Sequence, residues 1–452
     1  MTSYRGIAWV IFISCVLSIF TAWGNGFLSH TLFSDWRDDA EYYNARALSL
    51  VHTGSLGEEQ ALFRRPPGYS WFLALVYFFH ESIWAAWTAQ IGLFCGILFL
   101  LWHISGRFLS GWHAVLPSFF LGMYWGFHVY VFSIGSEMFS VFLLLVFLFF
   151  LLRYYDIPFA RYIVIAGFAA GLLALTKPVF LYAVPFFLAW LLYNIRSLKT
   201  LRHVIVCFGI VCAMVGGWAF RTYLFFGEAQ TERVGHVIYT RALYGTLSWE
   251  DIRSHLIASM AGNYIADQLF PGYGLNSVPQ RLGVRRMVVY NELRNQGLSP
   301  VLAEQRLLGE GISFIKSHSL KFTAGAVPAL FDLNTPENFS GFPITPMFVG
   351  TREHIPAWQK ITIVLFIRVV WFLVLLVCLM GCGKLLWDSS RRTVFSPLFF
   401  LILFFNGTHA LIIIPAEPRF LVPVLPIYFL CFTVGITWCL TRVKKMYSVE
   451  AL

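Results

Sequence analysis

The chain has 452 residues, of which 58% are hydrophobic and only 12% are charged, and its formal net charge is +10. Soluble domains carry about 25% charged residues, so this composition excludes a soluble enzyme, a DNA-binding module and a disordered protein. What remains is a protein with many membrane-spanning helices, each of which needs about 20 apolar residues to cross a hydrocarbon core of ~30 Å.

The apolar runs predict an all-α bundle of about ten transmembrane helices. In chain order they cover residues 7–28, 83–104, 112–133, 136–152, 162–176, 178–194, 203–224, 361–386, 395–414 and 420–441. The run 69–80 has only twelve residues, so it predicts an interfacial or re-entrant helix. The first run predicts a retained helix and not a signal peptide, because it has no Ala-x-Ala site and further spans follow.

The distribution of Lys and Arg predicts the orientation of the chain. With the N-terminus in the cytoplasm, the inner loops and helix ends hold thirteen basic and three acidic residues, a surplus that equals the net charge of the whole chain. The outer loop 225–360 holds twelve basic and eleven acidic residues, and the loop 29–81 holds four and seven. We therefore expect both termini in the cytoplasm and both large loops outside. Since this surplus also explains the basic pI near 9.2, the pI gives no evidence for nucleic-acid binding.

This topology predicts three parts of the chain. Residues 1–224 form a transmembrane module that contains the first outer loop, 29–82. Residues 225–360 form a small outer domain, in which the periodicity predicts helices at 280–297 and 299–318. Residues 361–452 add the C-terminal transmembrane helices. All eight cysteines fall inside predicted spans, so we expect no disulfide and no cysteine metal site in the outer loops.

Ionisable side chains in or beside spans are functional candidates, because burying them in lipid is costly. In this topology they gather at the outer ends of helices and in the first outer loop: Asp38, Asp39, Glu41, Arg64, Arg65, Glu137, Lys177, Arg221, Glu417 and Arg419. Arg368 lies about two turns into its span, within snorkelling reach of the same surface. The site is therefore expected to open outward.

The first outer loop contains more of these candidate residues than any other part of the chain. After Asp38, apolar residues recur at helical spacing, which predicts a short amphipathic helix on the membrane surface. Asp38 and Asp39 precede this helix, where they either cap it or act as a general base on a hydroxyl group near the lipid surface. Glu41 one turn on and the pair Arg64-Arg65 favour the second interpretation.

Six stretches, in order along the chain, resemble the GT-C membrane glycosyltransferases. The first loop reads D-D-A-E-Y-Y-N-A-R-A-L and then R-P-P-G-Y-S-W-F-L-A-L. It is similar to that of the bacterial family-39-like group, which includes protein O-mannosyltransferases and the lipid A aminoarabinose transferase. The others are Ser136-Glu137, G-L-L-A-L-T-K-P (171–178), G-G-W-A-F-R-T-Y-L-F-F-G (216–227), G-I-S-F-I-K-S-H-S-L-K-F (311–322) and A-E-P-R-F-L-V-P-V-L-P (416–426). The stretch 216–227 lacks the usual Pro and Asn, and Ser319 stands where Pro is usual.

The resemblance implies a function as well as a fold. Members of this group are inverting glycosyltransferases that move a sugar from a polyprenyl-phosphate carrier to an acceptor on the periplasmic face of the bacterial inner membrane. By motif position, the general base is Asp38, with Asp39 as the alternative. Arg and Lys suit the phosphate of the donor, and the candidates are Arg64, Arg65, Lys177, Arg221, Arg368 and Arg419. The supporting residues are Glu41, Tyr42, Glu137 and Glu417.

The resemblance implies no cofactor beyond the lipid-linked sugar. The histidines show no zinc-binding spacing. The oxygens of Asp38, Asp39 and Glu41 suit a divalent metal, but the resemblance implies none, so we expect no metal. We expect a monomer whose partners are the lipid carrier and a periplasmic protein, lipid or glycan acceptor. The sugar, the carrier length and the acceptor stay open.

Several alternatives also stay open. Lys177 and Arg221 are equally well explained as interfacial anchors, Arg419 as the partner of Glu417, and Arg368 as the partner of an outer carboxylate. Glu137 is explained equally as a helix N-terminal charge. The rival functions are a transporter or lipid flippase and a non-catalytic assembly subunit. The clean apolar midplanes and the single large outer loop argue against a transporter, whose polar residues gather near the bilayer midplane.

Overall fold

The computed structural model describes residues 2–24, 38–56, 66–226, 234–273, 277–335, 356–412 and 418–449. Within these ranges every regular element is a helix, and none is a strand. The predicted all-α class is therefore confirmed. The chain divides into two compact units, which are described separately: a first unit of Met1–Thr231, Leu375–Ile402 and Val422–Leu452, and a second unit of Glu232–Val374 and Leu403–Leu421.

The first unit holds the helices that precede residue 232 and the C-terminal helix. They are α1 (Thr2–Gly24), α2 (Asp38–Thr53), α4 (Gly68–Phe79), α5 (Ile83–Ser105), η3 (Gly111–Val115), α6 (Leu116–Met123), α7 (Trp125–Phe132), α8 (Ser136–Asp156), α9 (Ala160–Ala174), η4 (Pro178–Tyr182), α10 (Val184–Ile195), α11 (Leu198–Phe226) and α22 (Leu425–Val449). Two long helices, α20 (Ala357–Trp387) and α21 (Ser389–Ile412), contribute to both units.

Within the described ranges, eight helices are long and apolar enough to cross a membrane, which makes the chain a multi-pass membrane protein. Two of the ten predicted spans differ from the prediction. The run 112–133 forms two helices, α6 and α7, bent by 64° at Tyr124, and would make a ninth span only if the bent pair crosses as one. The run 162–176 forms α9, whose 15 residues reach only about 22 Å. The short helix predicted at 69–80 is confirmed as α4.

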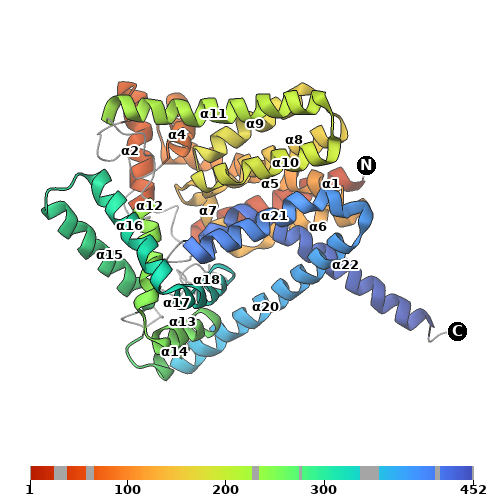
Figure 1. The fold of residues 1–452 in the computed structure, drawn as a ribbon. Coiled ribbons are helices and arrows are strands. Elements are labelled where there is room, and N and C mark those ends of the chain that lie inside the picture. The colour runs from red at the N-terminus through yellow and green to blue at the C-terminus, as the bar shows by residue number, and fades with distance from the viewer. Residues whose placement is uncertain are drawn as a thin grey trace. The chain divides into compact units, whose positions relative to one another are not determined.

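Close helix packing organises the first unit around α9. A Cβ on Gly167 would lie 3.3 Å from Cys207 Sγ, and a Cβ on Gly171 would lie 3.4 Å from Met214 Cβ. Small residues of this kind let two helix backbones approach. Because the contacts advance in the same direction along both helices, α9 and α11 run parallel, and α8, α9, α10 and α11 lie side by side (Figure 1). This parallel course brings the end of α9 beside Trp218 in α11.

The second unit has a hydrophobic core of its own, built by short helices. They are α12 (Val234–Ala242), η5 (Leu243–Thr246), α13 (Trp249–Ala261), α14 (Asn263–Leu269), α15 (Val278–Asn295), α16 (Pro300–Ser317), α17 (Ser319–Ala324) and α18 (Ala326–Leu333); η8 (Pro418–Val424) joins its last segment to the first unit. The helices predicted at 280–297 and 299–318 are confirmed as α15 and α16.

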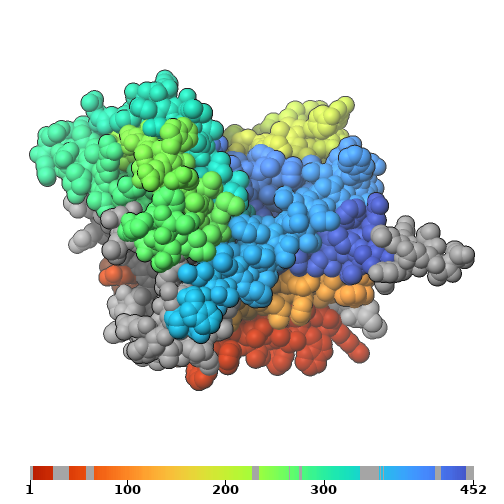
Figure 2. Space-filling view, turned by 90° about the horizontal axis from the view of Figure 1, so that it is seen from below, coloured from red at the N-terminus to blue at the C-terminus, as the bar shows by residue number. Residues whose placement is uncertain are grey.

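The core of the second unit contains Leu243, Tyr244, Ala303 and Leu307, all with no exposed surface. The green-to-teal helices of this unit present one continuous surface (Figure 2). Ser299 begins α16 as predicted, because its hydroxyl accepts a hydrogen bond from the Leu302 amide at 3.3 Å and Pro300 follows it.

Candidate active site

Helix α2 carries the two aspartates that the sequence analysis singles out. It begins at Asp38 and continues to Thr53, with Ala40 and Ala47 buried, so the predicted amphipathic helix is confirmed. Asp38 and Asp39 are its first two residues, and their side chains lie outside the description. The Tyr77 hydroxyl donates to Asn44 Oδ1 at 2.7 Å, which holds α2 against α4.

Helix α4 is in turn held against the end of α9. The Gly68 amide donates to the Leu175 carbonyl at 2.8 Å. A Cβ on Gly68 would clash with Thr176 Oγ1 and with the Leu175 carbonyl, so only glycine allows this approach. The contact therefore places α2 and α4 next to the segment that leads into Lys177.

Lys177 and Glu137 form an ion pair. Lys177 follows α9, and Glu137 lies in the first turn of α8. Lys177 Nζ donates to Glu137 Oε1 at 3.2 Å, and the two side chains are only 16% and 12% exposed. The structure therefore brings together two of the predicted site residues, one from the phosphate-binding set and one from the supporting set.

Two arginines of the first unit, Arg46 and Arg221, act on each other electrostatically. Arg46 in α2 is 3% exposed, and its guanidinium lies 5.2 Å from the centre of the Tyr42 ring. Arg221 stacks over Trp218 and Phe225, at 5.1 and 4.8 Å from the ring centres. Burial lowers the pKa of Arg46, and the positive charge of Arg221 lowers this pKa further. The two cations therefore lie within electrostatic reach of each other.

A small apolar cluster links the arginines to the ion pair. Leu56, Leu175 and Trp218 are buried against one another. Leu175 is two residues before Lys177, and Trp218 is one helical turn before Arg221. We call Arg46, Lys177 and Arg221 the basic cluster. Its members come from three segments, which the contacts of Leu56, Leu175 and Trp218 and of Gly68 with Leu175 hold together.

The basic cluster is chemically suited to an anion. Arg221 Nη1 is buried and has no hydrogen-bond partner among the described residues. Arginine donors bind phosphate oxygens through charge-assisted hydrogen bonds, and a buried donor without a partner is costly unless a ligand satisfies it. Glu137 offsets only part of the positive charge.

Arg368 is placed in the second unit, in α20. It is 7% exposed, and its Nη1 donates to the carbonyl of Ser259 at the end of α13. Its Nε lies 3.7 Å from the position of a Cβ on Gly262. Asp332 also acts on it electrostatically. Arg368 therefore holds α13 against α20 through a backbone carbonyl, whereas the alternative drawn from the sequence was an outer carboxylate.

Arg419 also lies in the second unit, where its guanidinium is 5.2 Å from the centre of the Phe420 ring. Phe420 in turn stacks on His409. Its proposed partner Glu417 falls outside the described residues, as do Arg64 and Arg65.

Of the remaining supporting residues, Glu41 is exposed and Tyr42 is half-buried beside Arg46. No group of three or more His, Cys, Asp or Glu side chains suited to a metal occurs in the part of the chain that the structure describes.

The sequence analysis missed Arg46. The signal was present, because Arg46 falls between Tyr43 and Ala47, which the periodicity assigned to the apolar face of α2. A cation on that face is unusual, since a guanidinium is rarely buried without a partner. It follows Asp38 by eight residues and Asp39 by seven in the same helix, or about two turns.

A further polar group lies in the second unit and has no counterpart in the sequence analysis. His255 Nε2 lies 2.8 Å from Asp332 Oδ2, and His255 Nδ1 hydrogen-bonds the hydroxyl of Tyr244. Tyr244 has no exposed surface and His255 only 3%. Three segments, η5, α13 and α18, are joined through this chain of hydrogen bonds.

The sequence itself matches no protein-family model and no curated protein. Comparison of the fold with solved structures is more informative. The crystal structure of the Archaeoglobus fulgidus oligosaccharyltransferase in the apo form covers 98% of this chain, with a TM-score of 0.53 and 11% sequence identity. The chain spans about half of the length of that protein, 52%.

Two further structures are more distant. The oligosaccharyltransferase AglB from Archaeoglobus fulgidus, in complex with an inhibitory peptide and a dolichol-phosphate, covers 98% of this chain and is itself covered to 52%, at 11% identity and a TM-score of 0.49. ArnT from Cupriavidus metallidurans, bound to undecaprenyl phosphate, covers 93% and is covered to 76%, at 17% identity and a TM-score of 0.37. On the first match, the chain shares the fold of the Archaeoglobus fulgidus oligosaccharyltransferase over nearly its whole length.

Proposed function

We propose that the chain is an inverting glycosyltransferase that moves a sugar from a polyprenyl-phosphate carrier to an acceptor on the outer face of a bacterial inner membrane. One observation carries the proposal: Arg46, in the helix that begins with Asp38 and Asp39, lies within electrostatic reach of Arg221. Lys177 follows the segment that packs against α4, the neighbour of that helix. A phosphate site and a carboxylate are the two elements that such a transfer needs.

The reaction divides between these elements. Asp38, or Asp39 in its place, accepts the proton of the acceptor hydroxyl. The acceptor oxygen then forms a bond to the anomeric carbon of the sugar while the bond from that carbon to the phosphate oxygen breaks, which inverts the configuration. The electron pair leaves with the polyprenyl phosphate, and the basic cluster stabilises the negative charge that develops there.

Glu137 has a positioning role in this proposal. Its carboxylate holds the Lys177 ammonium at 3.2 Å. A long lysine side chain loses considerable freedom when it is held in one place, so an ammonium that is already oriented is better prepared to meet the phosphate. No metal or other cofactor takes part in the proposed step.

The location and the partners follow from the sequence. The surplus of Lys and Arg in the inner loops supports cytoplasmic termini and a site that faces the periplasm. We propose that residues 225–360 form a small periplasmic domain that either recognises the acceptor or only covers the site, and that the enzyme acts as a monomer. The acceptor is a protein such as pilin, a lipid or a glycan.

One observation favours a transporter or flippase as a second candidate. Helices α6 and α7 are bent by 64° where they meet, and His128 in α7 is buried, with its Nδ1 2.6 Å from Ser18 Oγ. Broken helices and buried polar groups are typical of transport sites. Lys177 and Glu137, at the ends of their helices, fit that function less well.

Transfer of labelled sugar tests the proposal. Purified protein is incubated with polyprenyl-phosphate sugars and extracted envelope acceptors, and the wild type is compared with Asp38→Asn and Asp39→Asn. We expect one variant to lose transfer by at least 100-fold while it still binds the donor. Asn is close in size to Asp, so we do not expect either substitution to unfold the protein.

Unchanged transfer in both variants would refute the general-base assignment. Absence of transfer from every donor, together with movement of lipid or solute in liposomes, would favour the transporter.

A further inference from the structure

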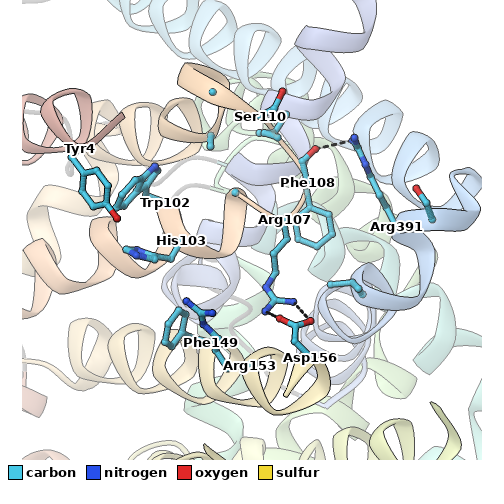
Figure 3. A pocket seen from close by; sticks show the side chains of 16 residues that line it. Tyr4, Trp102, His103, Arg107, Phe108, Ser110, Phe149, Arg153, Asp156 and Arg391 are labelled. Carbon is cyan, nitrogen blue, oxygen red and sulfur yellow. Dashed lines mark hydrogen bonds and ion pairs between the residues drawn. The ribbon is translucent and has the colours of Figure 1, made fainter. Parts of the chain in front are cut away.

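A second polar site lies at the other end of α8. It is a pocket of about 710 Å³, with walls from the end of α5, the loop that follows it, the last turn of α8 and the start of α21 (Figure 3). Arg153 lines it and follows Glu137 by sixteen residues in α8. At the rise of an α-helix this separation is about 24 Å, so the pocket is distinct from the basic cluster.

The lining of this pocket carries a surplus of positive charge. Three arginines face it, and among its lining residues only Asp156 is a carboxylate. Arg107 binds Asp156 with two parallel hydrogen bonds, one of them from Nη1 to Oδ1 at 3.1 Å (Figure 3). Arg391 donates to the Phe108 carbonyl at 2.7 Å and lies 3.7 Å from Asp388.

Among the three arginines that line the pocket, Arg153 is the one that no carboxylate of the described residues pairs with. Its guanidinium lies 5.4 Å from the centre of the Phe149 ring, and it forms no ion pair with a carboxylate of the described residues. Its side chain is exposed at the pocket. A phosphate that entered would meet this guanidinium first.

Aromatic side chains of the kind found beside lipid head groups line the pocket. Tyr4, which is 62% exposed, packs edge-on against Trp102 at 4.9 Å. Both line the pocket, as does Phe149. Tyr and Trp concentrate at membrane–water interfaces, so an occupant here would have a polar part beside the arginines and apolar chains beside the rings.

We propose that this pocket binds the phosphate group of an anionic phospholipid. Arginine presents planar, paired donors that match phosphate oxygens, and basic pockets between spans bind anionic head groups. Arg153 and Arg107 hold the phosphate, while Tyr4 and Trp102 contact the start of the acyl chains. In the predicted topology the lipid comes from the cytoplasmic leaflet. The site does not depend on sugar transfer.

Asp156 competes with the lipid for Arg107. In the structure its carboxylate occupies both donors of the Arg107 fork. A phosphate that binds Arg107 must replace these hydrogen bonds, so the removal of the carboxylate charge favours the lipid. Asp156→Asn is therefore expected to tighten binding, whereas loss of an arginine weakens it.

Native mass spectrometry of the full chain in a neutral detergent tests the proposal, with short-chain phosphatidylglycerol as the probe and phosphatidylcholine as the zwitterionic control. We expect Arg153→Gln to weaken phosphatidylglycerol binding about fivefold and Asp156→Asn to tighten it. The matched control is Arg161→Gln, which removes the same charge in the first turn of the next helix, α9, outside the pocket. It should leave the affinity unchanged.

Three results would overturn the proposal. Equal weakening by Arg153→Gln and Arg161→Gln would mean that only general surface charge matters. Equal binding of phosphatidylcholine would show that the head-group charge is not recognised. Displacement of the lipid by millimolar inorganic phosphate would assign the pocket to a free anion. The tightening expected for Asp156→Asn is a result that misfolding cannot produce.

Discussion

Lys177 and Glu137 lie 3.2 Å apart and connect the segment after α9 to the first turn of α8. Both side chains are largely buried, so each charge depends on the other for its stability. The pair also lies beside the proposed phosphate site. Its contribution to stability and its contribution to catalysis can therefore be separated by mutation.

A double-mutant cycle tests the stability of this pair. We expect Lys177→Met and Glu137→Gln each to lower the free energy of unfolding by roughly 1–3 kcal/mol, because each removes one side of a largely buried, hydrogen-bonded ion pair. The double variant should lose less than the sum, since no charge is then left behind. Thermal unfolding of the four proteins in detergent measures this, with Lys199→Met, an exposed lysine at a helix start, as the control. Strictly additive losses would contradict the coupling.

The basic cluster is expected to control donor affinity. Arg46→Gln and Arg221→Gln should each weaken binding of a polyprenyl-phosphate sugar roughly tenfold to a hundredfold, which corresponds to the loss of a hydrogen bond to a charged group. Arg46→Lys should recover only part of the affinity, because lysine lacks the planar pair of donors. Arg306→Gln is a suitable control, since that side chain is 66% exposed in the second unit. Donor binding that is unchanged in both cluster variants would exclude a phosphate role for them.

The hydrogen-bonded chain Tyr244, His255 and Asp332 is expected to stabilise the second unit. His255→Leu leaves the Tyr244 hydroxyl buried without its acceptor, so we expect a loss of roughly 1–3 kcal/mol. Adding Tyr244→Phe removes the stranded hydroxyl and should restore part of that loss. Hydrogen exchange of α13 and α18 would report the change. A double variant that is less stable than His255→Leu would show that the contact is not the cause.

Asp251 is expected to make the second unit sensitive to acid. Ser248 Oγ accepts from the Asp251 amide at 3.0 Å, the Ser248 amide donates to Asp251 Oδ2 at 3.1 Å, and Arg281 donates to Asp251 Oδ1. Partial burial alone raises the pKa of Asp251, but the hydrogen bonds from Arg281 and Ser248 outweigh it and bring the pKa below its ordinary value of 3.8.

The lowered pKa determines how the stability that Asp251 contributes changes with pH. The stabilisation by Asp251 is fully present above the unfolded-state pKa and is lost as the pH falls through the lower, folded-state value. We expect Asp251→Asn to cost about 1 kcal/mol at neutral pH, as for the loss of a helix cap, and the difference from the wild type to shrink below about pH 4. Unfolding temperatures measured between pH 7 and pH 3 would test this. A difference that grows on acidification would contradict it.

Chelation tests whether the proposed transfer needs a metal. Because arginine and lysine meet the phosphate charge in the proposed site, we expect EDTA to leave sugar transfer within about twofold of the untreated rate. An activity that EDTA abolishes and that added Mg²⁺ or Mn²⁺ restores would show that the carboxylates of the first loop bind a cation. The donor-binding assay separates this outcome from a loss of donor affinity.

Much of the fold could be predicted because the relevant signals are local. A run of apolar residues long enough to cross a bilayer is visible in the sequence, and eight of the ten predicted spans correspond to long helices. The two exceptions depend on more than hydropathy. A bend at Tyr124 divides one predicted span, and the other ends with α9 at Ala174. Helices α2, α15 and α16 were also predictable, since periodicity and caps mark them.

The candidate site was predictable only in part. The sequence indicated Glu137, Lys177 and Arg221 as polar residues at helix ends, but it offered no basis for choosing their partners. Arg368 shows the limit most clearly, because the same residue fits a ligand site or a contact within the protein, and the structure joins it to the carbonyl of Ser259. Arg46 was overlooked because it lies on the face of α2 that its neighbours make apolar.

By itself, then, the sequence determined that this is a helical membrane protein with a short amphipathic helix after its first span, because hydropathy and helical periodicity depend on neighbours along the chain. Only the tertiary structure decided which charges meet. Lys177 reaches Glu137 across 40 residues, and Arg46 lies near Arg221 from a different helix. The first pair forms because α8 and α9 pack on each other with the start of one beside the end of the other. The second forms because α2 and α4 pack against the end of α9, beside Trp218 of α11. Packing between separate helices leaves no periodic pattern in the sequence.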